Sequence, residues 1–196
     1  MKYLKRKVNY SDEEFKQIEY GLTGIYLTIS KIIIISLIAF CIGILKDMFI
    51  FMLIFNIIRT TAFGLHATKS WICLLSSSLI FLGIPLICIF ITISIYFKAI
   101  IGIISIMLIY KNAPADTKKR PIVNRKRRRR LKIISTGIAT VFLIISLLIS
   151  NNYISNCLLF SIILEDFLIA PCIYKLFNLP YNNYIDFLKS HPDFNY

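Results

Sequence analysis

Two side chains, Cys73 and His66, have the chemistry of a cysteine nucleophile and its base, and only six residues separate them. A thiol and an imidazole within reach of each other are the minimum parts of such a pair. In one straight helix they would share a face but lie about 10 Å apart along the axis, whereas proton transfer needs about 3 Å between heavy atoms. The spacing therefore predicts a helix–turn–helix, with His66 ending one helix and Cys73 beginning the next.

The polar residues between the pair favour that break. Ser70 is a suitable N-cap, which would place Cys73 in the first turn of the following helix. There the positive end of the helix dipole favours a thiolate, and free backbone N–H groups can stabilise an oxyanion. We expect Cys73 to be the nucleophile and His66 the base and later the acid. The alternative is a cysteine that packs as a small hydrophobe and a histidine at an interface.

Charged residues inside the apolar runs are the next candidates. Arg59 lies on the same helical stripe as His66 if one helix contains both. An arginine about two turns inside a span costs roughly 2.5–3.5 kcal/mol. It either extends toward the interface or faces the bundle interior, where it could bind a carboxylate. Glu165 and Asp166 in the last apolar run are equally costly. We expect one of them to pair with Arg59 or Lys31.

The elements that position these residues are membrane-spanning helices. Of 196 residues, 57% are hydrophobic and 17% are charged, against about 25% charged in a soluble domain. Apolar runs of about 18 or more residues recur, as is typical of transmembrane helices. The sequence predicts an all-α, polytopic membrane protein that forms a single domain over residues 1–196. We expect six spans with short turns, at roughly 25–45, 48–65, 72–91, 95–111, 133–150 and 153–174.

The distribution of basic residues predicts the orientation. They gather in an interfacial arm, 1–24, and in a loop, 112–132, which holds ten basic residues and a single acid, Asp116. Cytoplasmic loops are enriched in Lys and Arg. Six spans then place both termini, the His–Cys pair, the basic loop and a tail, 175–196, on the cytoplasmic side of the membrane.

Other functions for these residue types are less well supported. The basic run 125–130 could be a nucleic-acid patch, but it lies beside a span and contains no aromatic residue. We expect a topogenic loop that binds anionic lipid, and no nucleic-acid partner. Two histidines and dispersed cysteines do not make a zinc site, and we expect no metal or cofactor. Four cysteines lie in apolar runs, which argues against a disulfide framework: Cys41, Cys88, Cys157 and Cys172.

Three motifs carry a resemblance to a known family. The pattern R-x4-G-x-H-A-x5-C at 59–73, before an apolar span, closely resembles the signature of the AgrB family, membrane peptidases of bacterial peptide quorum sensing. The segment APADTKKRP at 113–121 is a second match, and APCIYK at 170–175 is a weaker third. With the size and span layout, the resemblance covers residues 10–180.

The resemblance implies a cysteine endopeptidase that cuts a short AgrD-like precursor near its C-terminus. Cys73 would attack the scissile carbonyl, with His66 as its acid and base. The acidic C-terminal fragment would leave, and the precursor would remain as a thioester on Cys73. A thiol or hydroxyl of the precursor would then displace Cys73 and close a thiolactone or lactone ring.

The family's supporting residues carry over by position. Arg59 and Gly64 would support the site, and Lys118 and Lys119 would contact the acidic part of the precursor. Thr60 stands where a second basic residue is common, which departs from the pattern. The resemblance also implies a bacterial plasma membrane and allows a homodimer.

Two other classes of function remain open from the residues alone. One is a small transporter or channel that uses Arg59, Glu165 and Asp166 as an intramembrane relay. The other is a non-catalytic scaffold whose basic loop binds lipid or a partner.

Overall fold

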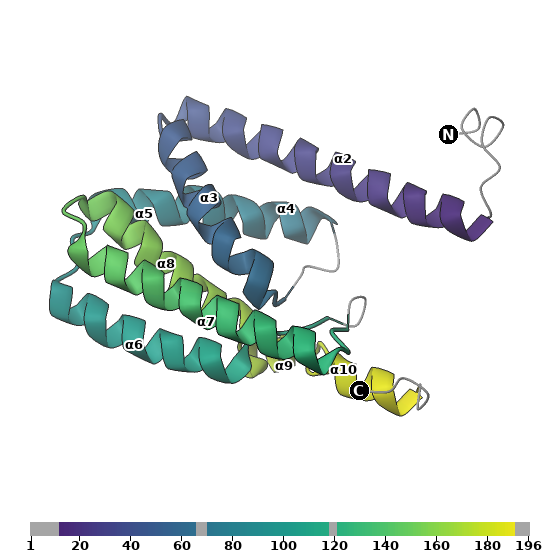
Figure 1. Cartoon of the computed structure of the whole chain (residues 1–196). Coiled ribbons are helices and arrows are strands. Elements are labelled where there is room, and N and C mark those ends of the chain that lie inside the picture. Colours follow the sequence, from purple (N-terminus) through teal and green to yellow (C-terminus); the bar gives the residue numbers. More distant parts are fainter. Residues whose placement is uncertain (1–11, 66–69, 118–120, 191–196) are drawn as a thin grey trace. The chain divides into compact units, whose positions relative to one another are not determined.

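The computed structural model describes residues 12–65, 70–117 and 121–190, and its regular elements are all helices (Figure 1). The chain divides into two units, the first ending at Gly43 and the second beginning at Ile44. The first unit contains α2 (Asp12–Cys41). The second contains α3 (Leu45–Ala62), α4 (Ser70–Ser78), the π-helical η1 (Leu79–Gly83), α5 (Ile84–Phe90), α6 (Ile95–Asn112), α7 (Arg125–Leu148), α8 (Asn152–Ile169), α9 (Pro171–Leu176) and α10 (Asn183–Ser190). The all-α prediction is confirmed.

Within the part of the chain that the structure describes, five helical stretches are long and apolar enough to cross a membrane: residues 21–41 of α2, the run from α4 to α5, α6, α7 and α8. Helix α3 has the same 18-residue length as α6 and α8, but it carries Lys46, Asp47 and Arg59. A multi-pass membrane protein is therefore confirmed. The sixth expected span is α3. It carries more charged residues than the five stretches above, apart from the basic start of α7.

The first turn lies earlier than predicted. Helix α2 ends at Cys41, and Gly43 adopts a positive φ of 78° after it. Lys46 and Asp47, which were expected to form the turn, lie in the first turn of α3. Glycine reaches positive φ without a steric cost, so the turn forms at the glycine and not at the nearest charged residues.

The long apolar block after the His–Cys segment forms two helical stretches, as predicted. One runs continuously from α4 through η1 to α5, and the other is α6. The π-helical turn of η1 precedes Pro85. A proline ring crowds the carbonyl four residues before it, here Phe81, and a local widening of the helix relieves that contact.

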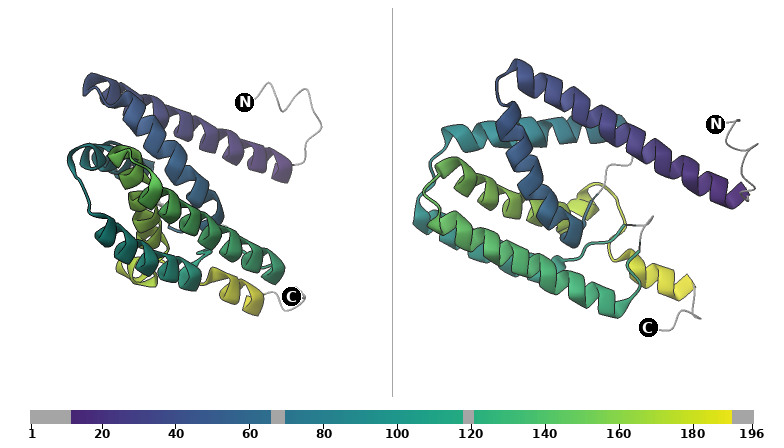
Figure 2. Two further views of the ribbon diagram at one scale, coloured as in Figure 1. Left: turned by 60° about the vertical axis from the view of Figure 1, so that its left-hand side comes forward. Right: turned by 45° about the horizontal axis from the view of Figure 1, so that its top comes forward.

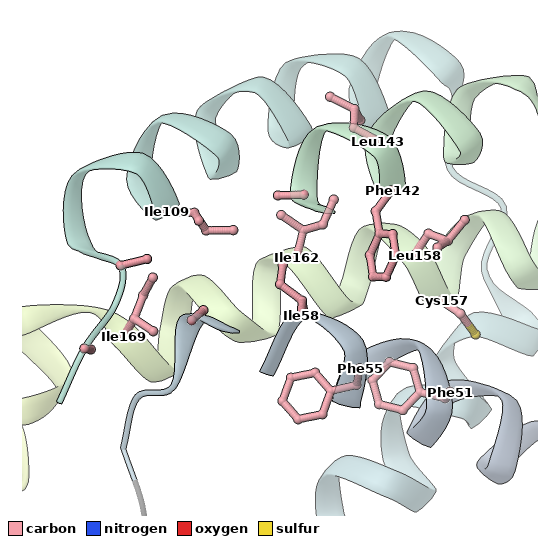
Figure 3. Close-up of a cluster of buried hydrophobic side chains, with 14 of the residues drawn as sticks. Phe51, Phe55, Ile58, Ile109, Phe142, Leu143, Cys157, Leu158, Ile162 and Ile169 are labelled. Atoms are coloured by element: carbon pink, nitrogen blue, oxygen red, sulfur yellow. The ribbon is translucent and has the colours of Figure 1, made fainter. Parts of the chain in front are cut away.

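Helix α8 is the centre of the second unit, because it contacts α3, α5, α6 and α7. The views in Figures 1 and 2 show α6 and α7 running side by side. The core of the second unit consists mainly of aromatic and aliphatic side chains from several of its helices (Figure 3). Phe51 and Phe55 of α3 stack with their ring centroids 6.1 Å apart. Ile162 of α8 and Phe142 of α7 are buried in the same cluster.

A buried polar cluster joins the ends of four helices at the start of α8. Lys98 is only 4% exposed, and its Nζ donates to Ser155 Oγ at 2.5 Å. Ser146 donates to the Ser155 carbonyl at 2.8 Å. Asn156 Nδ2 donates to the carbonyls of Cys88 and, at 2.6 Å, Ile91. Buried polar groups must be hydrogen-bonded within the bundle, and these bonds hold α5, α6, α7 and α8 together.

Two predicted boundaries in the C-terminal half are wrong. The basic loop was expected to reach residue 132, but Asn124 caps α7 by accepting from the Arg127 N–H at 2.9 Å, so the run 125–130 is helical. The last span was expected to continue to residue 174, but α8 ends at Ile169 and α9 begins at Pro171. The residue before a proline avoids the helical conformation, and Ala170 is extended with ψ 130°.

Candidate functional site

The segment that leads to the His–Cys pair begins where α3 stops at Ala62. Phe63 and Gly64 follow with positive φ angles of 62° and 101°. The predicted helix break near Gly64 is therefore present. The second span was expected to continue to residue 65, with Arg59 and His66 on one stripe, and that part is wrong because left-handed residues end the helix.

Backbone hydrogen bonds hold residues 63–65 from two sides. Gly64 N–H donates to the Ala115 carbonyl at 2.9 Å, and Ala115 N–H donates to the Ala62 carbonyl at 3.0 Å. Leu65 N–H donates to the Leu168 carbonyl near the end of α8, at 2.9 Å. The segment thus lies between the 113–116 stretch and α8. Because the 113–121 motif and the R-x4-G-x-H motif meet here, two of the sequence motifs belong to one structural unit.

Arg59 faces into this unit. Its Nη1 donates to the Phe63 carbonyl and to Glu165 Oε1 at 3.3 Å, and its Nη2 donates to the Leu65 carbonyl at 2.5 Å. The Arg59 side chain is 19% exposed and that of Glu165 is fully buried. Of the two orientations that the sequence left open, Arg59 thus adopts the interior one, and the expected pairing with a last-span acid is confirmed. The guanidinium binds carbonyls and a carboxylate of its own chain.

Asp166, the neighbouring acid, belongs to a different contact. It is 8% exposed and lies near the Ser105 side chain of α6, and its Oδ1 has no hydrogen-bond partner among the described residues. The two acids of α8 therefore face two different helices, Glu165 toward α3 and Asp166 toward α6.

Cys73 lies in the first turn of α4, as predicted. Ser70 is the first residue of α4, whereas the sequence suggested that it would precede the helix as its N-cap. The Cys73 side chain is half-buried, and its carbonyl accepts from Ser76 Oγ at 3.2 Å. The other thiols are either fully buried, as Cys88 and Cys157 are, or exposed, as Cys41 and Cys172 are. His66, Lys118 and Lys119 lie outside the described residues.

Sequence reasoning missed the role of Asp116. This buried residue, 2% exposed, accepts four hydrogen bonds through its carboxylate. The donors are Tyr184 N–H at 2.9 Å, Asn183 N–H at 3.0 Å, Ile122 N–H at 3.4 Å and Arg128 Nη1 at 3.5 Å. Asp116 therefore caps the start of α10 and ties it to the start of α7. Its isolation among ten basic residues was the signal in the sequence.

Aromatic side chains surround this aspartate. Tyr174 and Asn183 donate to its carbonyl at 3.4 and 3.3 Å, and the Arg128 guanidinium lies 3.6 Å from the centroid of the Tyr184 ring. Burial raises the pKa of Tyr181, which packs edge-on against Tyr174 at 5.1 Å. Among the six basic residues of 125–130, Arg128 is the one that turns inward; the others are exposed.

We expect Asp116→Asn to lower the free energy of unfolding by about 1–3 kcal/mol, because bonds to a charged acceptor are lost and an NH₂ group faces N–H donors. Helix α10 should detach first. Limited proteolysis of the C-terminal region and thermal unfolding in detergent would measure both effects. Asp186→Asn, at an exposed acid of α10, is the matched control. Equal protection of α10 in both variants would contradict this role.

Comparison with known proteins gives consistent matches. A family model described as AgrB, accessory gene regulator B, matches residues 1–169. An AgrB-like protein of Clostridium acetobutylicum is 30% identical over 177 residues, covering 90% of this chain and 85% of that protein. Accessory gene regulator protein B of Staphylococcus aureus strain MW2 is 33% identical over 179 residues, covering 88% of this chain and 91% of that protein. No solved structure matches this chain.

Proposed function

Because this chain belongs to the accessory gene regulator B family, we propose that it is a membrane-embedded cysteine endopeptidase that processes a peptide precursor. Membership of the family supports a role in the agr quorum-sensing system. The observation that carries the proposal is the placement of Cys73. It is a half-buried thiol in the first turn of a helix that follows an anchored segment ending next to His66.

The proposed reaction has two acyl-transfer steps. Cys73 Sγ attacks the carbonyl carbon of the scissile peptide bond, and His66 takes the thiol proton. The carbon–nitrogen bond then breaks, and His66 delivers that proton to the leaving amine. The N-terminal part of the precursor stays on Cys73 as a thioester. A thiol or hydroxyl of the precursor attacks this thioester, a ring forms, and the Cys73 thiolate leaves.

Two features of the fold suit these steps. The first turn of a helix offers free backbone N–H groups to an oxyanion on the attacked carbonyl, and Cys73 lies in that turn of α4. The apolar helices around the site would limit water, which would otherwise hydrolyse the thioester.

We propose an AgrD-like peptide with an acidic C-terminal part as the substrate. Lys118 and Lys119 would contact that acidic part, and the exposed basic residues at the start of α7 would add to the attraction or bind anionic lipid. We propose that both termini, the catalytic pair and the basic segment lie on the cytoplasmic side of a bacterial plasma membrane, because basic residues gather in these parts of the chain. The arrangement is compatible with a homodimer.

The contacts of the intramembrane charges favour a peptidase over a transporter. A proton or ion relay needs groups that can exchange partners. Arg59 instead binds Glu165 and two carbonyls of the segment before His66. These contacts support a structural role for Arg59 and Glu165.

Mass spectrometry of the wild-type protein with a candidate precursor tests the proposal. We expect the precursor to lose its acidic C-terminal fragment. The protein should gain the mass of the remaining peptide at Cys73, and hydroxylamine should remove it, as it does a thioester. A folded protein that leaves both the precursor and its own mass unchanged would overturn the proposal.

A further inference from the structure

Glu165 is outside the proposed nucleophile–base pair, yet it is a fully buried acid beside the segment that leads to it. Its Oε1 binds Arg59 Nη1 at 3.3 Å. Its Oε2 has no hydrogen-bond partner among the described residues. A buried carboxylate placed against one cation is a costly feature of a helix.

The Arg59 guanidinium connects Glu165 to the backbone of residues 63–65. It donates to the carbonyls of Phe63 and Leu65, and Leu65 is bonded directly to His66. Both bonds require the guanidinium to stay inside the bundle, although its aliphatic stem could carry it toward the membrane surface. The Glu165 carboxylate supplies the opposite charge that keeps it inside.

Helix α8 holds the same backbone a second time. The Leu65 N–H donates to the Leu168 carbonyl, one turn beyond Glu165. Both polar groups of the Leu65 backbone are therefore fixed to α8, one directly and one through Arg59. These two attachments hold Leu65, the last described residue before His66.

We propose that Glu165 is a positioning residue of the peptidase site. It retains the Arg59 guanidinium, which in turn fixes the backbone next to His66 so that the imidazole can serve Cys73. This inference rests on the proposed function. It differs from the proposed substrate contacts, because it predicts an effect on the chemical step and none on precursor binding.

The matched pair Glu165→Gln and Asp166→Asn tests the proposal. Both changes neutralise a buried acid of α8 at nearly constant size, but Glu165 alone of the two binds Arg59. With purified protein in lipid nanodiscs, we expect Glu165→Gln to lower kcat about 100-fold with KM within about 3-fold of wild type, as a misplaced catalytic group does. Asp166→Asn should stay within about 3-fold of wild type in both constants.

A second readout separates positioning from general stability. The rate of Cys73 alkylation by iodoacetamide, followed at its peptide across pH 5–9, reports how the neighbouring imidazole acts on the thiol. We expect the Glu165→Gln profile to move to that of His66→Ala, and the Asp166→Asn profile to overlay the wild type. A Glu165→Gln profile and rate equal to wild type would overturn the inference.

A milder variant tests the positioning role of Glu165 if Glu165→Gln does not accumulate in the membrane. Glu165→Asp keeps the charge but withdraws the carboxylate by one methylene, so we expect a folded protein with an intermediate loss of kcat and a partly shifted alkylation profile. Wild-type behaviour of Glu165→Asp would then overturn the inference. Failure of the proposed function itself looks different, because the wild type would not cleave and His66→Ala would leave the alkylation profile unchanged.

Discussion

Replacing Cys73 with alanine is expected to abolish precursor cleavage, a loss on the order of 10⁴-fold or more, because the proposed acyl intermediate forms on its thiol. The change removes one sulfur from a half-buried side chain, so the protein should still reach the membrane at the wild-type level. Release of the acidic fragment, followed by mass spectrometry over time, measures the loss. No adduct should form on the variant.

The other thiols provide the controls for Cys73→Ala. Cys41 and Cys172 are more exposed than Cys73, so general thiol reactivity would make them equal or better nucleophiles. Their alanine variants should cleave at the wild-type rate. Cleavage by Cys73→Ala that is lost only when Cys172 is also replaced would contradict the assignment and move the nucleophile to α9.

The sequence predicted the helix break before Cys73 correctly because two independent requirements coincide there. The proposed reaction needs His66 and Cys73 closer than a straight helix allows, and Gly64 is a residue type that readily ends a helix. The extent of the helix before it was wrong, since apolar composition continues to Leu65 while the left-handed backbone already begins at Phe63. Hydropathy does not predict which residues adopt a positive φ.

The contacts around Asp116 could not be predicted from local sequence. Two of its partners, Asn183 and Tyr184 at the start of α10, lie 67 and 68 positions further along the chain, and a third, Arg128, lies in the first turn of α7. Positive-inside reasoning treats the 112–132 stretch as a solvated loop, whereas one buried carboxylate organises it. The pairing of Arg59 with a last-span acid was predictable, because isolated charges inside a bilayer must find each other. The choice of Glu165 over Asp166 depends on how α8 is rotated within the bundle.

Helix α8 holds the segment before His66 through a backbone hydrogen bond and an ion pair. Leu168 and Glu165 act on the segment before His66, and α8 packs against α3 and α5 on either side of that segment. Cys73 lies on α4, which continues through η1 into α5, and α5 packs against α8; Leu65, the last described residue before His66, is also held by α8. Changes that shift α8 should therefore reduce catalysis without touching either residue.

Gly64→Ala is expected to have the second-largest effect, lowering the free energy of unfolding by about 2–4 kcal/mol and reducing cleavage at least as much as Glu165→Gln. A Cβ at this position would lie 2.6 Å from Arg59 Nη1 and 2.7 Å from the Leu168 carbonyl oxygen. The carbonyl belongs to a packed helix and cannot move away, and φ is 101°. The substitution thus displaces the guanidinium and the Leu65 attachment together.

Gly43→Ala separates the two causes of that loss. Gly43 also has a positive φ, 78°, but a Cβ there meets nothing within 4 Å. Its alanine variant should show only backbone strain, about 1–2 kcal/mol, with the cleavage rate unchanged. Thermal unfolding and cleavage kinetics of the two variants in the same detergent measure the difference. Equal losses in both would mean that backbone strain alone explains Gly64, and the close approach of Arg59 and α8 to this segment would then have no part in catalysis.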